Sequence, residues 1–230
     1  MLGFEMLTRI ITTALFAGFI AGILAAILQF LLVQPLLLHA ELFEGGDLTH
    51  FGASGAGTTA HAPWPGIDPM RDMLSVVFTA LIYTGYAFLL VAAVAFAADR
   101  GHDITPRTGL IWGVAGFVAV QLAPAMGLPP ELPGAGAADV APRQVWWFGT
   151  LFATGLGLWL IAFGQSAVSW IIGAAALAVP HIIGAPQPDL LVGPVPPEIA
   201  AHFAARALGT GLVAWVILGG LVGYFWNKEA

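Results

Sequence analysis

The sequence predicts an all-α integral membrane protein, built as a bundle of about six transmembrane helices. Of its 230 residues, 59% are hydrophobic and only 9% are charged, whereas soluble domains carry about a quarter charged residues. The mean hydropathy of +0.89 points to the same class. Apolar stretches recur along the whole chain, so we expect residues 1–230 to form a single transmembrane helical domain.

Six apolar stretches are candidate spans, because a helix of about 20 apolar residues crosses the hydrocarbon core. The first stretch contains no charged residue and lacks the small-residue cleavage site of a signal peptide, so we expect it to remain in the mature protein as a span. The fifth is the shortest, so a five-span chain is the alternative. The predicted spans are residues 10–38, 73–98, 108–126, 145–163, 167–183 and 207–226.

Charge and histidine are distributed unequally between the two sides. Cationic residues are slightly more numerous on the side of the N-terminus, which predicts a cytoplasmic N-terminus and an outer loop at residues 39–72. Most acids lie on the outer side, and of the six histidines only His102 lies on the inner side. This grouping on one side does not depend on which side is outside.

Two further patterns concern how the spans pack. Gly-x-x-x-Gly ridges allow helices to approach closely and indicate a bundle; they are Gly18/Gly22, Gly109/Gly113 and Gly219/Gly223. A proline near the end of each outward span and an arginine before each return span can be read as three helical hairpins: Pro35 and Arg71, Pro124 and Arg143, Pro180 and Arg206. The alternative is that prolines at helix ends and arginines at interfaces are ordinary.

The exit of the first span is the sharpest candidate metal site. His39, Glu41 and Glu44 follow the apolar stretch directly. If the helix continues, the two carboxylates lie three residues apart on one face, while the imidazole lies about 200° away from Glu41. The three converge only if the helix bends, and a hydrated helix end is the simpler interpretation.

A second candidate set surrounds the last outer loop. His181 ends the fifth span, and Pro197 suits the first turn of a helix that places Glu198, His202 and Arg206 on one stripe. A carboxylate and an imidazole one turn apart can bind a divalent cation, but an exposed charge ladder has the same pattern. His50 and His61 lie in a Gly/Ala/Thr-rich stretch, residues 45–62, where a rigid site is not expected.

The residue types limit the chemistry. The chain has no cysteine, so imidazole and carboxylate remain, which suits divalent Co, Ni, Zn or Mn rather than Cu(I). No Lys, Arg, Asp or Glu lies inside a predicted span, and a proton-coupled pump normally needs one there. Common enzyme motifs such as HExxH, GxSxG and the phosphate loop are missing. The net charge of −6 argues against nucleic acid as a partner.

Several phrases of the chain resemble the CbtA family of bacterial multi-pass proteins. They are PLLLHAELFE (35–44), LAPAMGLPPELPG (122–134), RQVWW (143–147), PHIIGAPQP (180–188) and VPPEIAAHF (195–203). The resemblance implies a subunit of a cobalt transporter in the bacterial inner membrane, paired with a small one-span, histidine-bearing partner, CbtB. It assigns no binding residues.

We therefore expect a membrane subunit that collects cobalt or another divalent cation as substrate, with no permanently bound cofactor and no catalysis. The expected ligands are His39, Glu41, Glu44, His181, Glu198 and His202. A non-catalytic structural or assembly subunit of a larger membrane complex is the first alternative, because the predicted spans contain no charged group. An intramembrane metalloenzyme is the second, and it requires three or four ligands converging on one point.

Overall fold

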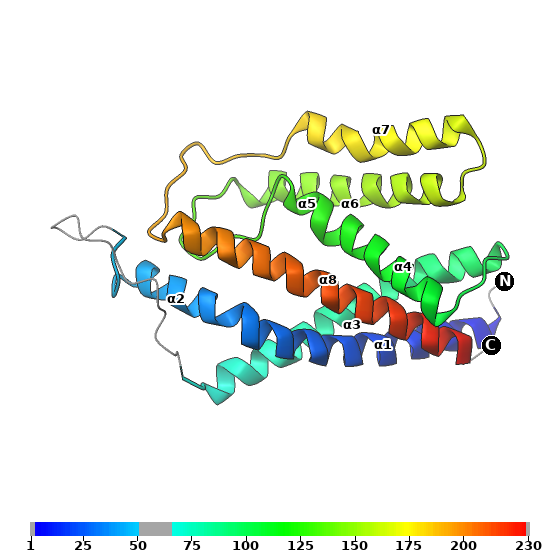
Figure 1. Cartoon of the computed structure of the whole chain (residues 1–230), viewed down its shortest axis with the longest axis horizontal. Helices are drawn as coiled ribbons and strands as arrows, with labels where there is room; N and C mark the ends of the chain where they lie inside the picture. Colours follow the sequence, from blue (N-terminus) through cyan, green and yellow to red (C-terminus); the bar gives the residue numbers. More distant parts are fainter. Residues whose placement is uncertain (1–2, 51–65, 229–230) are drawn as a thin grey trace. The chain divides into compact units, whose positions relative to one another are not determined.

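The computed structural model describes residues 3–50 and 66–228, and every regular element within these ranges is a helix (Figure 1). The elements are α1 (Phe4–Leu32), α2 (Gln34–Glu44), α3 (Pro69–Asp99), α4 (Pro106–Phe117), the π-helix η1 (Val118–Leu122), α5 (Ala123–Ala125), α6 (Val140–Phe163), α7 (Ala167–Ile183) and α8 (Pro197–Lys228). The predicted all-α membrane fold is confirmed.

Five helical runs of the described chain are long and apolar enough to cross a membrane. They are α1, α3, the run Pro106–Ala125, α6 and α8, and they correspond to five of the six predicted spans. Helix α7 has the predicted bounds of the fifth span, but its 17 residues give about 25 Å at 1.5 Å per residue. That is shorter than the ~30 Å hydrocarbon core, so the choice between five and six spans stays open.

The first predicted span is not one continuous helix. Helix α1 ends at Leu32, Val33 forms a turn, and α2 then runs from Gln34 to Glu44. Pro35 explains the break, because a proline has no N–H and its ring clashes with the carbonyl of the preceding turn. The start of the predicted outer loop, residues 39–44, is therefore helical, while residues 51–65 of that loop, with His61, lie outside the described residues.

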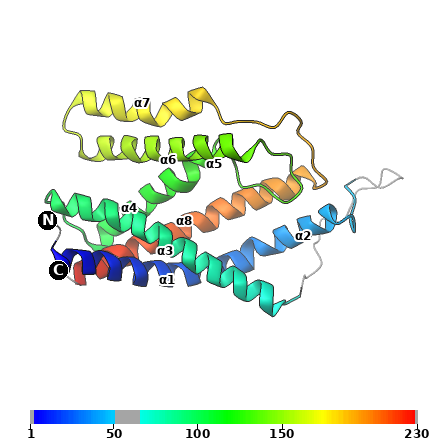
Figure 2. The same ribbon diagram turned by 180° about the vertical axis from the view of Figure 1, so that it is seen from behind.

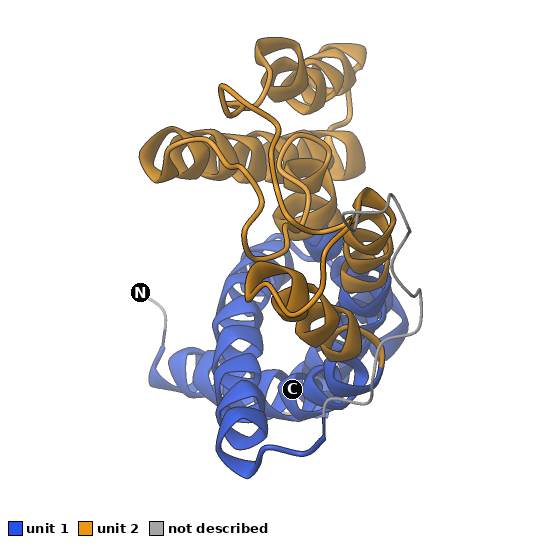
Figure 3. Ribbon diagram, turned by 90° about the vertical axis from the view of Figure 1, so that its left-hand side faces the viewer, with its two compact units in different colours: residues 1–31, 66–117, 209–230 blue, residues 32–65, 118–208 orange. Residues whose placement is uncertain are grey.

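The described chain divides into two compact units (Figure 3). The first comprises residues 1–31, 66–117 and 209–230, and the second comprises residues 32–65 and 118–208. That both units act as the single domain expected from the sequence stays a prediction.

Close helix contacts in the first unit use the predicted glycine ridges. A Cβ atom added to Gly18 would lie 2.5 Å from Cα of Thr84, and one added to Gly22 would lie 2.5 Å from Cα of Ala80. Helices α4 and α8 interlock in the same way, because a Cβ atom on Gly219 would lie 2.5 Å from the amide nitrogen of Gly113. Glycine is required here since any side chain would strike the neighbouring backbone.

Polar groups in the first unit join helix to helix. The Arg9 guanidinium donates two hydrogen bonds to the Trp226 carbonyl and lies 4.2 Å from the centroid of that indole ring. The Thr79 hydroxyl donates to Oε1 of Gln29 at 3.2 Å. These bonds tie α1 to α8 and α3.

The second unit contains the hairpin of α6 and α7, which run side by side in opposite directions (Figure 2). Ser166 begins α7, because its hydroxyl accepts a hydrogen bond from the amide of Ser169. The hairpin closes tightly at Gly157 and Gly173, where an added Cβ atom would lie 2.8 and 2.9 Å from the partner's carbonyl oxygen. Helix α6 also packs against η1 and α5.

Candidate functional site

All six predicted ligands belong to the second unit. Three lie on α2 (His39, Glu41 and Glu44), one lies near the end of α7 (His181), and two lie on the first turns of α8 (Glu198 and His202).

His39 is the buried member of the set. Its side chain is 3% exposed, and its Nε2 atom has no hydrogen-bond partner among the described residues. The ring contacts Phe43 one helical turn later, with 5.4 Å between ring centroids. Burial lowers the pKa of His39 below its ordinary value of 6.5, because an apolar environment disfavours the charged imidazolium. The imidazole is therefore neutral at neutral pH, which is the form that binds metals.

Glu41 and Glu44 lie on the same helix but are exposed. Because α2 continues to Glu44, these two residues are three apart in one helix and share one of its faces. The same helix keeps the buried His39 on another side, so the three side chains do not converge on α2.

Two loops meet beside Glu44. The amide of Gly136 donates a 2.8 Å hydrogen bond to the Val192 carbonyl, which joins the segment after α5 to the segment after α7. A Cβ atom on Gly134 would lie 3.2 Å from the Pro194 ring and 3.5 Å from Cγ of Glu44. The end of α2 and both proline-containing loops are thus neighbours.

His181 is half-buried against α6. The Trp146 indole meets the imidazole edge-on, with 6.1 Å between centroids, and its Nε1 donates to the Pro180 carbonyl at 3.1 Å. Pro180 lies within α7, so the indole helps hold the turn that contains His181.

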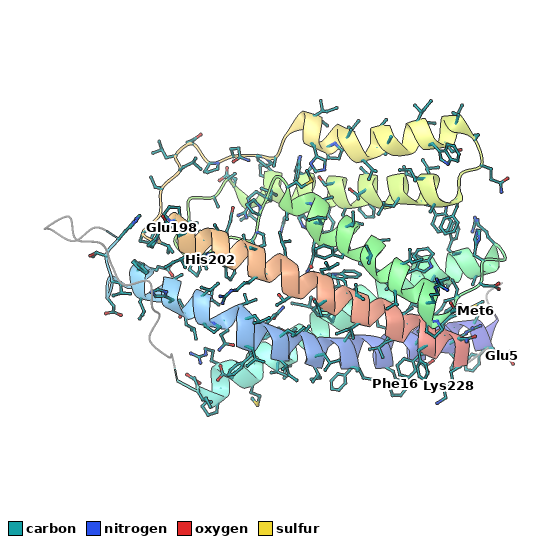
Figure 4. All side chains as sticks on the ribbon, viewed as in Figure 1. Glu5, Met6, Phe16, Glu198, His202 and Lys228 are labelled. Atoms are coloured by element: carbon teal, nitrogen blue, oxygen red, sulfur yellow. The ribbon has the colours of Figure 1, made fainter. Side chains whose placement is uncertain are left out.

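Glu198 and His202 are exposed and lie one turn apart near the start of α8 (Figure 4). Helix α8 begins at Pro197, as the sequence predicts. Arg206, on the next turn, donates to the Leu32 carbonyl at 3.2 Å and so contacts the break between α1 and α2.

Within residues 3–50 and 66–228, no three histidine or acidic side chains are grouped closely enough to hold a metal ion. The six predicted ligands therefore do not form a complete coordination shell in the part of the chain that the structure describes, and their role as ligands stays a prediction. For the same reason these residues show no intramembrane metalloenzyme centre.

Two further polar groups of the second unit are buried: Oε1 of Gln121 in η1 and Oγ1 of Thr154 in α6. Neither atom has a hydrogen-bond partner within the described residues. Neither residue is among the six ligands predicted from the sequence. The available signal was a polar side chain in an apolar span, with Gln121 three residues before Pro124.

The long apolar helices define a multi-pass membrane protein, with exposed histidines and acids at helix ends. The chain matches the family model described as "Probable cobalt transporter subunit (CbtA)" over residues 7–227, and it belongs to that family. No curated protein and no solved structure matches it.

Proposed function

We propose that this chain is the membrane subunit of a divalent metal uptake system that collects cobalt at the outer face of the bacterial inner membrane. Its N-terminus lies in the cytoplasm. Cobalt is the cargo, and the chain holds no permanent cofactor and catalyses no reaction. The collecting residues are His39, Glu41, Glu44, His181, Glu198 and His202.

The buried imidazole of His39 is the observation that supports this proposal most strongly. A buried nitrogen without a hydrogen bond costs free energy, of the order of 1–3 kcal/mol, and Nε2 of His39 is such an atom within the described residues. Its lowered pKa keeps it available as a lone-pair donor at neutral pH. Co²⁺ accepts imidazole nitrogen and carboxylate oxygen, and both are present on α2.

A partner subunit is proposed to complete the coordination. The residues that the structure describes contain no group of three ligands, and the family is that of a transporter subunit. A small one-span, histidine-bearing subunit of the CbtB kind would add the missing imidazoles. Each chain alone would then bind cobalt weakly, and the pair would bind it well.

Cobalt accumulation in cells tests the proposal. Cells expressing the chain with its one-span partner should accumulate more radioactive cobalt than cells expressing either chain alone. The triple variant His39→Ala, Glu44→Ala, His181→Ala should lose most of this gain. Unchanged accumulation in the triple variant would remove these residues from the transport path.

A second triple variant controls for the loss of ionisable side chains elsewhere; it removes one histidine and two acids, where the test variant removes two histidines and one acid. His102, Asp99 and Asp103 are exposed and lie at the connection between α3 and α4. Replacing all three with alanine should leave accumulation near the wild-type level. Equal losses in both triple variants would indicate a general charge effect rather than a site.

A structural or assembly subunit is the second candidate. Only 17% of the most apolar window of α6 is buried, against 44% for α3 and α8, so α6 offers a wide apolar face to lipid or to another subunit. If cells that lack this chain lose assembly of their other transporter subunits, and the His39 variants restore that assembly without restoring uptake, both roles apply. Assembly without any cobalt-dependent role would favour the second candidate alone.

A further inference from the structure

A backbone irregularity interrupts the third predicted span. Helix α4 passes into the π-helix η1 (Val118–Leu122), and α5 follows with Pro124 as its second residue. Single π-turns inside helices occur frequently at functional sites. Proline has no N–H, so a carbonyl one turn earlier loses its helical donor. Inside a membrane, such irregular backbone is tolerated where it is covered by protein or lines a polar cavity.

Gln121 lies within this π-helix. Its Oε1 atom is buried and accepts no hydrogen bond from the residues described. An unpaired amide oxygen is costly in an apolar environment, and a methionine or leucine would fill the same space without that cost. The carbonyl oxygen is therefore the feature of this residue that needs an explanation.

Thr154 presents a second unpaired oxygen on α6, the helix that packs against η1. The residue is fully buried, and its hydroxyl has no partner within the described part of the chain. Thr150, one turn earlier and equally buried, behaves in the ordinary way, because its hydroxyl donates to the Trp146 carbonyl at 2.8 Å. The two threonines are thus equally buried, but within the described residues only the Thr150 hydroxyl forms a hydrogen bond.

We infer that Gln121 and Thr154 form a neutral, oxygen-lined contact point for the metal within the second unit, below the histidines and acids that collect it. This inference rests on the proposed function. The predicted spans contain no Lys, Arg, Asp or Glu. A cation inside these spans would therefore be contacted by neutral oxygens such as those of Gln121 and Thr154. The partner-free amide and hydroxyl oxygens take the place of part of the hydration shell of the cation.

Neutral oxygens suit a transit point better than carboxylates do. Conduction requires binding that is favourable enough for entry but weak enough for release. Imidazole holds Co²⁺ more strongly than amide or hydroxyl oxygen does. Cobalt would therefore be captured by imidazole and carboxylate and passed to weaker ligands.

The test uses near-isosteric apolar replacements, Gln121→Met and Thr154→Val, in cells that also express the one-span partner. Each variant should lower the initial rate of radioactive cobalt uptake roughly fivefold, the effect of losing one polar contact of about 1 kcal/mol. Because each removes an unpaired buried group, the thermal stability of the purified chain should stay equal or rise. Slower uptake with undiminished stability separates a transport contact from a folding defect.

Thr150→Val and Gln165→Met are the matched controls. Thr150 has the same burial as Thr154 but a satisfied hydroxyl, and Gln165 is exposed between α6 and α7. Both should keep the wild-type uptake rate. Wild-type uptake in both Gln121→Met and Thr154→Val would overturn the inference, and so would an effect of only one of them, because the contact point is shared.

Failure of the proposed function gives a different result. If wild-type cells with the partner accumulate no more cobalt than cells without the chain, the uptake proposal fails and this inference falls with it. If wild-type uptake is present and the His39, Glu44, His181 triple variant abolishes it while Gln121→Met and Thr154→Val do not slow it, only the inference falls.

Discussion

The two units treat buried polar groups differently. In the first unit, the Arg9 guanidinium and the Gln29 amide are used to join helices. Its unpaired buried atoms, in Thr13 and Trp215, lie in uninterrupted α-helices. In the second unit, Thr154 likewise lies in an uninterrupted α-helix, but His39 follows a helix break and Gln121 lies in a π-helix. All three have unpaired buried atoms within the described residues.

We interpret the first unit as a scaffold and the second unit as the working region of the proposed function. Departures from local rules, such as unpaired polar atoms and irregular helix, concentrate at functional sites in natural proteins. Both kinds of departure coincide at Gln121, so under the proposed function we assign contact with the cargo to the second unit. The first unit supplies close packing through its glycine contacts.

The largest expected effect comes from the glycine contact between α4 and α8. Gly219→Ala adds a single Cβ atom, which would overlap the backbone at Gly109 and Gly113. We expect a loss of about 1–3 kcal/mol, because neighbouring backbone cannot move aside as a side chain can. Thermal unfolding of the purified chain in detergent measures it.

Gly85→Ala is the control for that substitution. Gly85 also lies inside a long helix, but a Cβ atom there meets nothing within 4 Å. Its stability should be equal to or above that of the wild type, since alanine favours a helix over glycine. If both variants unfold at the same temperature, the first unit is not a tightly packed scaffold.

A smaller effect is expected at Arg9. Arg9→Lys keeps the charge but removes the planar group that donates twice to the Trp226 carbonyl and lies over its ring. We expect a loss of about 1 kcal/mol in unfolding free energy. Arg107→Lys, at an exposed position in the first turn of α4, should change nothing measurable. Equal losses of unfolding free energy in Arg9→Lys and Arg107→Lys would mean that the contacts of Arg9 with Trp226 add no specific stability.

The pH dependence of the unfolding free energy tests the burial of His39 in the second unit. The pKa of His39 is lowered in the folded chain and 6.5 is its ordinary value, so the unfolded chain binds more protons as pH falls below about 6.5. Stability from this group is present above that pH and declines as pH falls towards the lowered pKa. The slope is at most about 1.4 kcal/mol per pH unit.

His39→Leu should remove that part of the pH dependence and leave the stability at neutral pH equal or higher. His202→Leu, on the exposed start of α8, is the matched variant and should keep the wild-type profile. Unfolding in detergent between pH 7.5 and 5 gives all three curves. An unchanged slope in His39→Leu would mean that this imidazole takes its proton as easily in the fold as in the unfolded chain.

Much of the fold follows from the sequence for a simple physical reason. Lipid offers the backbone no hydrogen bonds, so apolar stretches of sufficient length must be helical, and the glycine ridges identify where helices meet. That is why α7 has the predicted bounds and why Gly109, Gly113 and Gly219 lie in contact. The break at Val33 was harder to predict, because a proline near a helix end can either cap, kink or interrupt it.

The candidate site follows from the sequence far less well. Residue type and spacing indicated His39, Glu41 and Glu44, but burial separates the first from the other two, and burial depends on neighbouring helices distant in sequence. The π-turn at Gln121 has no signature in the local pattern. The difference between Thr150 and Thr154 is likewise set by side-chain orientation, which spacing alone does not give.

The smallest effect is expected at the ion pair of the second unit. The Arg143 guanidinium and the Glu131 carboxylate lie 2.7 Å apart, with side chains 28% and 31% exposed. Because solvent screens pairs of this kind, a double-mutant cycle with Arg143→Gln and Glu131→Gln should give a coupling of less than about 1 kcal/mol, reduced further by added salt. A coupling well above that, insensitive to salt, would mean that the loop between α5 and α6 is held as firmly as the helices of the first unit. The loop between α5 and α6, beside Glu44, would then not differ in rigidity from the helices of the first unit.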